Sequence, residues 1–210
     1  MEAVEIKLEE NPLELVKDGI AKGMDYEQYR ELVAQLAKHG QTTGSEQLEA
    51  RINYTELNDR RMKRWDKTIK IPEEAQQQIA KVKSKLVFLV LSESWCGDAA
   101  PSLPVMNKIA ELNPNIELKI ILRDEHLDVM NQFLTNGSQS IPKLVILDQD
   151  ADTLVGEWGP RPGIATQMVE DFKKEHGTLT SQFKQDLQVW YNKDKGQNTL
   201  NDLLNLLPLE

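Results

Sequence analysis

The stretch that decides the fold of this chain is Ser94-Trp95-Cys96-Gly97-Asp98-Ala99. It follows an apolar run over residues 86–91, of the kind that forms a central strand buried on both faces. A helical pattern begins directly after it. Open α/β sheets hold their ligands at the carboxyl ends of their strands, so this turn is the predicted site of chemistry.

Cys96 is the only cysteine among the 210 residues. A thiol at the first turn of a helix faces unpaired backbone N–H groups and the positive end of the helix dipole, which lower its pKa. The carboxylate of Asp98, two residues away, acts in the opposite direction. The sequence therefore predicts an accessible, partly ionised nucleophile at Cys96, and the balance of the two effects on its pKa stays open.

These residues resemble the active site of the thioredoxin superfamily, which reads Trp-Cys-x-x-Cys after a central strand. Trp95, Cys96 and Gly97 match this motif. Asp98 stands where proline is commonest, and Ala99 stands in place of the second, resolving cysteine. The resemblance is therefore to a bacterial-type thioredoxin-like protein with a single-cysteine motif.

Two later landmarks support the resemblance. Pro104 matches the proline that bends the family's active-site helix, and Ile141-Pro142 matches the family's Ile-cis-Pro loop before a strand over residues 143–147. Val90 occupies the position of the buried acid that assists catalysis in many thioredoxins. The resemblance covers roughly residues 66–176.

The resemblance also implies roles for particular side chains. Cys96 is the expected catalytic nucleophile. The residues expected to bind substrate, including the loop edge that pairs with an extended partner segment, are Trp95, Gly97, Asp98, Ser140, Ile141 and Pro142.

Two arginines are further candidates for contact with a thiolate or another anion. Arg123 follows a strand pattern over residues 116–122 at the same sheet edge as Cys96, and Arg161 lies in a Gly-Pro-Arg-Pro-Gly loop. The competing interpretation of Arg123 is an ion pair with a neighbouring acid. For Arg161 it is a loop that only turns a corner.

The remaining patterns predict an α/β fold with a thioredoxin-like mixed sheet of about four to five strands, the last of them antiparallel, flanked by helices. We expect an N-terminal helical extension over residues 1–70 packed on the core, a thioredoxin-like domain over 71–176, and extra C-terminal helices over 177–210. Thr43 and Glu46 have the spacing of a capping box that opens the third helix.

The charge balance argues against several classes of partner. Lys and Arg total 25 against 34 Asp and Glu, a net charge of −9, which repels phosphate backbones and anionic membranes. Residues 1–10 are acidic and unlike an export signal, and no apolar run approaches the ~20 residues of a membrane span. We therefore expect a cytoplasmic protein without nucleic-acid or membrane partners, as a monomer or weak homodimer.

Two local clusters of charge have plain interpretations. The acids at 148, 150 and 152 lack the glycine and the terminal glutamate of a calcium loop, so they indicate a turn, and no metal or cofactor is expected. The basic stretch over residues 58–67 is typical of a solvated helix face paired with nearby glutamates. The alternative is a patch that grips an anionic partner or a small thiol.

A single thiol limits the chemistry. Without a cysteine at position 99, a mixed disulfide on Cys96 must be resolved by an external thiol. The first hypothesis is a monothiol thiol–disulfide exchange protein that acts on a protein or low-molecular-weight thiol or disulfide. The alternative is a non-catalytic thioredoxin-fold binding or redox-sensing module.

Overall fold

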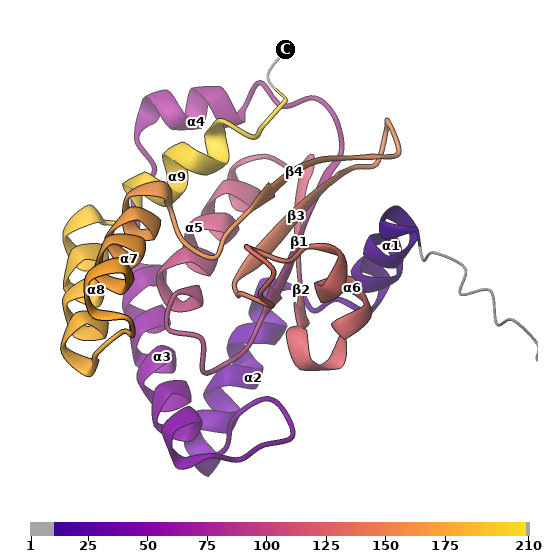
Figure 1. Ribbon diagram of the computed structural model, residues 1–210. Coiled ribbons are helices and arrows are strands. Elements are labelled where there is room, and N and C mark those ends of the chain that lie inside the picture. Colours follow the sequence, from indigo (N-terminus) through magenta and orange to yellow (C-terminus); the bar gives the residue numbers. More distant parts are fainter. Residues whose placement is uncertain (1–10, 209–210) are drawn as a thin grey trace, which may run out of the picture.

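The computed structural model describes residues 11–208, which contain a four-stranded mixed sheet with helices on both faces (Figure 1). The strands are β1 (Leu86–Ser92), β2 (Ile116–Leu122), β3 (Lys143–Asp148) and β4 (Thr153–Trp158), in the order β2-β1-β3-β4. β2 runs parallel to β1, whereas β3 is antiparallel to both β1 and β4. The predicted α/β fold, with an antiparallel last strand, is confirmed.

The helices of the described residues are α1 (Pro12–Lys22), α2 (Tyr26–His39), α3 (Glu49–Thr68), α4 (Glu73–Ile79), α5 (Ala99–Leu112), α6 (Leu127–Gln132), α7 (Gly163–His176), α8 (Ser181–Asp194) and α9 (Gln197–Leu204). α1 and α6 lie together on one side of the sheet, and α5 lies on the other, with α3, α4 and α9 packed against α5 (Figure 1). Residues 1–10, on which the expected lack of an export signal rests, lie outside the described residues. Among the helices of the described chain, none is long and apolar enough to cross a membrane.

β1 is the centre of the fold because it has a partner strand on each side and helices over both faces. All seven of its residues are buried. The six apolar residues 86–91 suit a strand covered on both faces, so the continuous apolar run of the sequence becomes the middle of the sheet. β1 ends at Ser92, and the turn that contains Cys96 follows directly.

The N-terminal helices contribute to the same hydrophobic core as the sheet. Val16, Tyr29, Val33 and Met62 are buried in one cluster with the residues of β1. The Tyr29 hydroxyl also lies 3.3 Å from Oγ of Ser92, at the end of β1. These helices therefore support the strand end that carries the site.

The start of α3 differs from the prediction. α3 begins at Glu49, and its N-cap, Leu48, makes no side-chain cap. The predicted capping box at Thr43 is wrong because the Thr43 hydroxyl has another partner: it accepts a hydrogen bond of 2.9 Å from the backbone N–H of Ser94. The loop before α3 is thus held against the turn that follows β1.

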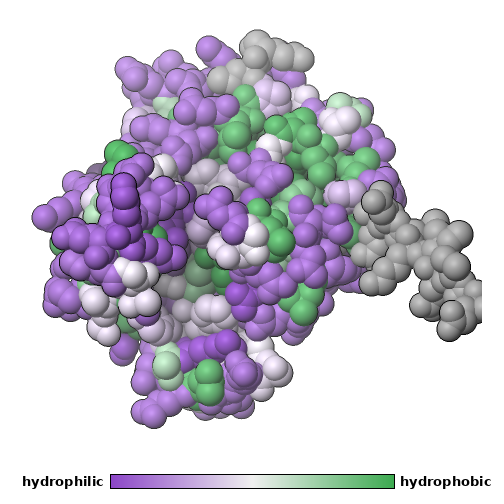
Figure 2. Space-filling model, viewed as in Figure 1, coloured by the Kyte–Doolittle hydropathy of each residue, from purple (hydrophilic) through white to green (hydrophobic). Residues whose placement is uncertain are grey.

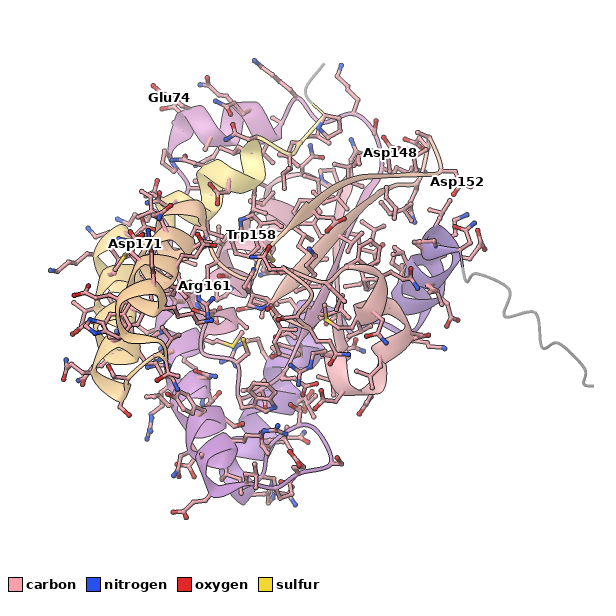
Figure 3. The ribbon with its side chains drawn as sticks, viewed as in Figure 1. Glu74, Asp148, Asp152, Trp158, Arg161 and Asp171 are labelled. Carbon is pink, nitrogen blue, oxygen red and sulfur yellow. The ribbon has the colours of Figure 1, made fainter. Side chains whose placement is uncertain are left out.

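The hairpin between β3 and β4 contains the acidic series. Asp148 Oδ1 accepts hydrogen bonds of 2.9 Å from the backbone N–H groups of Asp150 and Ala151, which closes the turn. Asp152 pairs with Lys17 of α1 at 2.7 Å, and Figure 3 shows Asp148 and Asp152 at the α1 side of the molecule. The series is a turn, as its spacing indicated.

α7 and α8 form a helical hairpin after β4. Their apolar side chains build a second hydrophobic cluster, separate from the sheet core, with Trp65 of α3: Trp65, Ala165, Val169, Phe183, Leu187 and Tyr191. The outer surface of this hairpin is mainly hydrophilic (Figure 2).

Candidate active site

Cys96 lies in a tight turn between β1 and α5, which we call the Cys96 turn (residues 93–98). Its backbone N–H donates to the carbonyl oxygen of Glu93 at 3.0 Å, which closes the turn. α5 begins at Ala99 with Asp98 as its N-cap, so the sulfur lies before the helix rather than in its first turn. The backbone N–H groups of Asp98 and Ala99 nevertheless lower the pKa of its thiol.

The Ile141-Pro142 loop, which is distant in sequence, contacts the sulfur of Cys96. The Ile141–Pro142 peptide bond is cis. Sγ of Cys96 donates to the carbonyl oxygen of Ile141 at 3.3 Å. The resemblance placed these two segments side by side although 45 residues separate them in sequence, and the structure brings them together.

The loop edge expected to receive a partner segment is covered. Ile141 is 8% exposed and Pro142 is buried, whereas Ser140 is partly exposed. Gly159 packs on this edge so closely that a Cβ on it would lie 2.1 Å from the Pro142 carbonyl oxygen. Gly159 has φ +121°, so both its conformation and its surroundings require glycine. The loop between β4 and α7 therefore lies where the partner segment was expected.

The predicted accessible and partly ionised thiol is wrong for this conformation. Cys96 is only 6% exposed. Burial first, and then the Asp98 carboxylate, raise the pKa of its thiol to about 12. The N–H groups of Ala99 and Asp98 and the guanidinium of Arg161 lower the pKa by less. Burial thus outweighs the helix-start donors, and the thiol is protonated at neutral pH.

Asp98 contacts two segments that are distant in sequence, the loop after β4 and helix α8. Its Oδ2 lies 2.6 Å from an Nη of Arg161, and its Oδ1 accepts a hydrogen bond of 3.2 Å from the Tyr191 hydroxyl. Burial raises the pKa of the Asp98 carboxyl, and Arg161 offsets part of this rise. Figure 3 shows Arg161 in the loop after Trp158. The loop thus does more than turn a corner, because it fixes Arg161 on the Cys96 turn.

Trp95 is flanked by two arginines. The guanidinium carbons of Arg51 and Arg123 lie 4.8 and 5.1 Å from the centroid of its ring. Arg123 also pairs with Asp124 at 2.7 Å, as its competing interpretation held. Arg123 therefore orients Trp95, and the contacts described for its guanidinium are with Trp95, Asp124 and the Gln139 carbonyl oxygen rather than with the sulfur.

Sequence reasoning missed the polar residues that hold Ser94. The Ser94 hydroxyl lies 2.8 Å from that of Thr55 and 3.1 Å from that of Thr42, and Asn58 Nδ2 donates to the Ser94 carbonyl oxygen at 2.9 Å. Thr55 and Asn58 are three residues apart on α3, and this spacing was the one local signal. Arg61, in the basic stretch, donates to Asn58 Oδ1 at 3.2 Å.

Sequence reasoning also missed two contacts from α8. Gln188 Nε2 donates to the Gly97 carbonyl oxygen at 3.2 Å, next to the contact of Tyr191 with Asp98.

Within residues 11–208, no group of three or more His, Cys, Asp or Glu side chains is arranged to hold a metal ion.

The comparisons with known proteins agree with this fold. A family model described as Thioredoxin matches residues 44–173. The chain belongs to this family. Two solved structures share the thioredoxin-like fold: a protein of unknown function, PA1234 from Pseudomonas aeruginosa, and an HIV epitope scaffold.

These likenesses are to the fold alone. PA1234 has 19% sequence identity and a TM-score of 0.59, and the match covers 90% of this chain and 95% of that one. The scaffold has 20% identity and a TM-score of 0.58, with the same coverage of 90% and 95%. No curated protein matches the chain.

Proposed function

We propose that this thioredoxin-family protein is a monothiol thiol–disulfide exchange protein with Cys96 as its nucleophile. The observation that carries the proposal is the 3.3 Å contact between the Cys96 sulfur and the Ile141 carbonyl oxygen, beside the cis peptide bond of Pro142. A disulfide whose backbone reached this loop would bring one of its sulfurs to Cys96. The N–H groups of Asp98 and Ala99 are placed to stabilise the thiolate that attacks.

The reaction has two steps. The Cys96 thiolate attacks one sulfur of a disulfide, a new S–S bond forms, and the other sulfur leaves as a thiolate that takes a proton from solvent. The thiolate of an external thiol then attacks the mixed disulfide at the substrate sulfur and forms a new S–S bond with it, and Cys96 leaves as a thiolate that takes a proton from solvent. Electrons pass from the external thiol to the original disulfide, so Cys96 ends in its starting state.

The external thiol is essential because Ala99 supplies none. We therefore expect the protein to work in a compartment rich in low-molecular-weight thiols, such as the cytoplasm. Trp95 and Gly97 would shape the approach of the disulfide, and Ser140 is the part of the loop edge that is partly exposed already. A thiol with a pKa of about 12 reacts slowly, so exchange would proceed from a more open conformation.

One observation favours the alternative of a non-catalytic binding or redox-sensing module. Cys96 is 6% exposed, and burial and Asp98 together keep it protonated. In that case the thioredoxin fold would serve as a scaffold, and the sulfur would act as a small apolar side chain. Exchange chemistry is the first proposal because the amide donors and the Ile141 loop both converge on the sulfur.

Incubation with oxidised glutathione, followed by intact-mass measurement, separates thiol–disulfide exchange from a binding module whose thiol does not react. We expect one glutathionyl group per chain, its removal by added free glutathione, and no adduct on Cys96→Ser. An unmodified wild-type chain after hours at pH 8, under conditions that modify the same chain unfolded in urea, would refute exchange and support the binding module.

A further inference from the structure

We propose that α8 is a releasable cover that controls access to Cys96, and we call it the α8 cover (Ser181–Asp194). This inference names the regulation of the proposed exchange site and so rests partly on that function. Four features of the described residues support it: the contacts of α8 with the Cys96 turn, its separate hydrophobic cluster, the glycines that bound it, and the attachments of its neighbours that do not involve α8.

The contacts of the α8 cover with the Cys96 turn are polar and few. Tyr191 donates to Asp98, and Gln188 donates to the Gly97 carbonyl oxygen, both at 3.2 Å. Tyr191 is 1% exposed. Burial raises the pKa of Tyr191 well above its ordinary value, and the nearby negative charge of Asp98 raises it further.

The apolar face of the α8 cover is not part of the sheet core. Phe183, Leu187 and Tyr191 pack with Trp65 and with α7 in the second cluster. By contrast, Leu200 and Leu203 of α9, the next helix, are buried in the main core. A segment with its own small cluster can open without exposing the large one, which is the usual basis of local unfolding.

Residues with left-handed backbone conformation bound the α8 cover on both sides. Gly177, before it, has φ +77°, and Lys195 and Gly196, after it, have φ +56° and +79°. Glycine accommodates a wide range of dihedral angles, so these positions can absorb a change in direction of the helix.

The neighbours of the α8 cover have attachments that do not involve α8. Asp202 of α9 accepts hydrogen bonds from the Gly163 N–H at 3.0 Å and from Trp158 Nε1 at 3.1 Å. Arg161, just before α7, is ion-paired with Asp98. The start of α7 is therefore tied to α9 and to the Cys96 turn. α8 is tied to the Cys96 turn by Gln188 and Tyr191 and to α3 by the hydrogen bond from Arg64 to Asn192, and it is the element that the proposal releases. Its departure would free Gly97 and one oxygen of Asp98.

The test compares the wild type with Gln188→Ala/Tyr191→Phe, which removes both hydrogen bonds to the Cys96 turn. The matched control is Gln182→Ala, which removes a hydrogen bond to Asp186 on the exposed side of the same helix. The readout is the rate of Cys96 alkylation by iodoacetamide and by a bulky polyethylene-glycol maleimide. A net hydrogen bond contributes ~1 kcal/mol, so losing two should raise alkylation about tenfold or more in the double variant.

The two reagents distinguish opening from a change in thiol pKa. A lower pKa would accelerate both reagents equally, whereas release of the α8 cover accelerates the bulky reagent more. We therefore expect the ratio of the bulky to the small reagent's rate to rise in the double variant and to stay at the wild-type value in Gln182→Ala. An unchanged ratio would overturn the proposal.

Native-state hydrogen exchange of the wild type provides a second measurement that needs no variant. We expect the amides of the α8 cover to exchange through an opening of lower free energy than those of β1. Exchange of α8 only with global unfolding would also overturn the proposal. If Cys96 is readily alkylated in the double variant but oxidised glutathione does not modify it, the exchange function is refuted and the proposal of the α8 cover still holds.

Discussion

Cys96 shows how burial can override the electrostatics of a helix start. Two backbone N–H groups and the cation of Arg161 lower the pKa of its thiol, yet burial and Asp98 outweigh them and raise it to about 12. The reason is that a buried thiolate loses the solvation that a few donors only partly replace. The sulfur is therefore in the right place for exchange but in the wrong protonation state, and reactivity depends on whether water and partners reach it.

The raised pKa of the Cys96 thiol predicts how its alkylation rate depends on pH. The rate tracks the thiolate fraction, so the logarithm of the iodoacetamide rate should rise steadily from pH 7 to 10 without levelling. The chain unfolded in urea serves as the control, and its rate should level near the ordinary cysteine pKa of ~8.5. A plateau in the folded protein below pH 9 would mean that the thiol pKa is not raised.

Restoring the missing cysteine tests the alignment of the motif. Side chains three residues apart at a helix start have Cβ atoms ~5–6 Å apart, within reach of a disulfide after a small adjustment. We expect Ala99→Cys to form an intramolecular disulfide with Cys96 on mild oxidation, counted as the loss of two free thiols. Ala110→Cys, further along α5, should keep both thiols free. Two free thiols in oxidised Ala99→Cys would show that the motif is misaligned.

Among the elements, the loop between β4 and α7 decides whether the Ile141-Pro142 edge is open. Gly159 allows this loop to pack against the Pro142 carbonyl oxygen, where a Cβ would come within 2.1 Å. Alanine there must push the loop away and also strain a φ of +121°. Gly159 therefore allows the loop to cover the Ile141-Pro142 edge, and no larger residue fits at position 159 without moving the loop.

We expect Gly159→Ala to lower the free energy of unfolding by about 2–4 kcal/mol, at the upper end of ordinary single substitutions. Gly163→Ala is the matched control, because no atom lies within 4 Å of a Cβ at that position, and its effect should stay within about 0.5 kcal/mol. Urea denaturation measures both. Equal stabilities would mean that the loop is not packed on Pro142 in solution.

The elements differ in how far the sequence could predict them. β1 was predictable because burial on both faces is recorded in consecutive apolar residues. The cis-proline loop was found through the resemblance. The capping box at Thr43 failed because Ser94, far along the chain, takes its hydroxyl.

The contacts of α8 left no local signal, since Tyr191 and Asp98 are 93 residues apart. The protonation state of Cys96 could not be predicted from the sequence either, because it depends on contacts between residues far apart along the chain. Its nearest charge is visible in the motif, but its burial depends on segments far along the chain, such as the Ile141 loop that contacts the sulfur.

For the whole molecule, the helices before the family match contribute to one shared core. Val16, Tyr29 and Val33 precede residue 44, where the match begins, yet they are buried in the same cluster as β1. The smaller cluster of α7, α8 and Trp65 is separate. This arrangement predicts that α1–α3 and the sheet unfold together, whereas α8 can open on its own.

Met62→Ala tests this cooperativity. Met62 lies in α3 and is 2% exposed in the main cluster, so its truncation should cost about 2–5 kcal/mol. If α1–α3 and the sheet form one unit, the urea midpoint should fall equally by far-UV circular dichroism and by hydrogen exchange at β1 amides. Leu48→Ala, at a side chain that is 52% exposed, should leave the midpoint unchanged. A loss of helix signal with undiminished protection of β1 would show that the N-terminal helices fold as a separate unit, with the strand end beneath Cys96 stable without them.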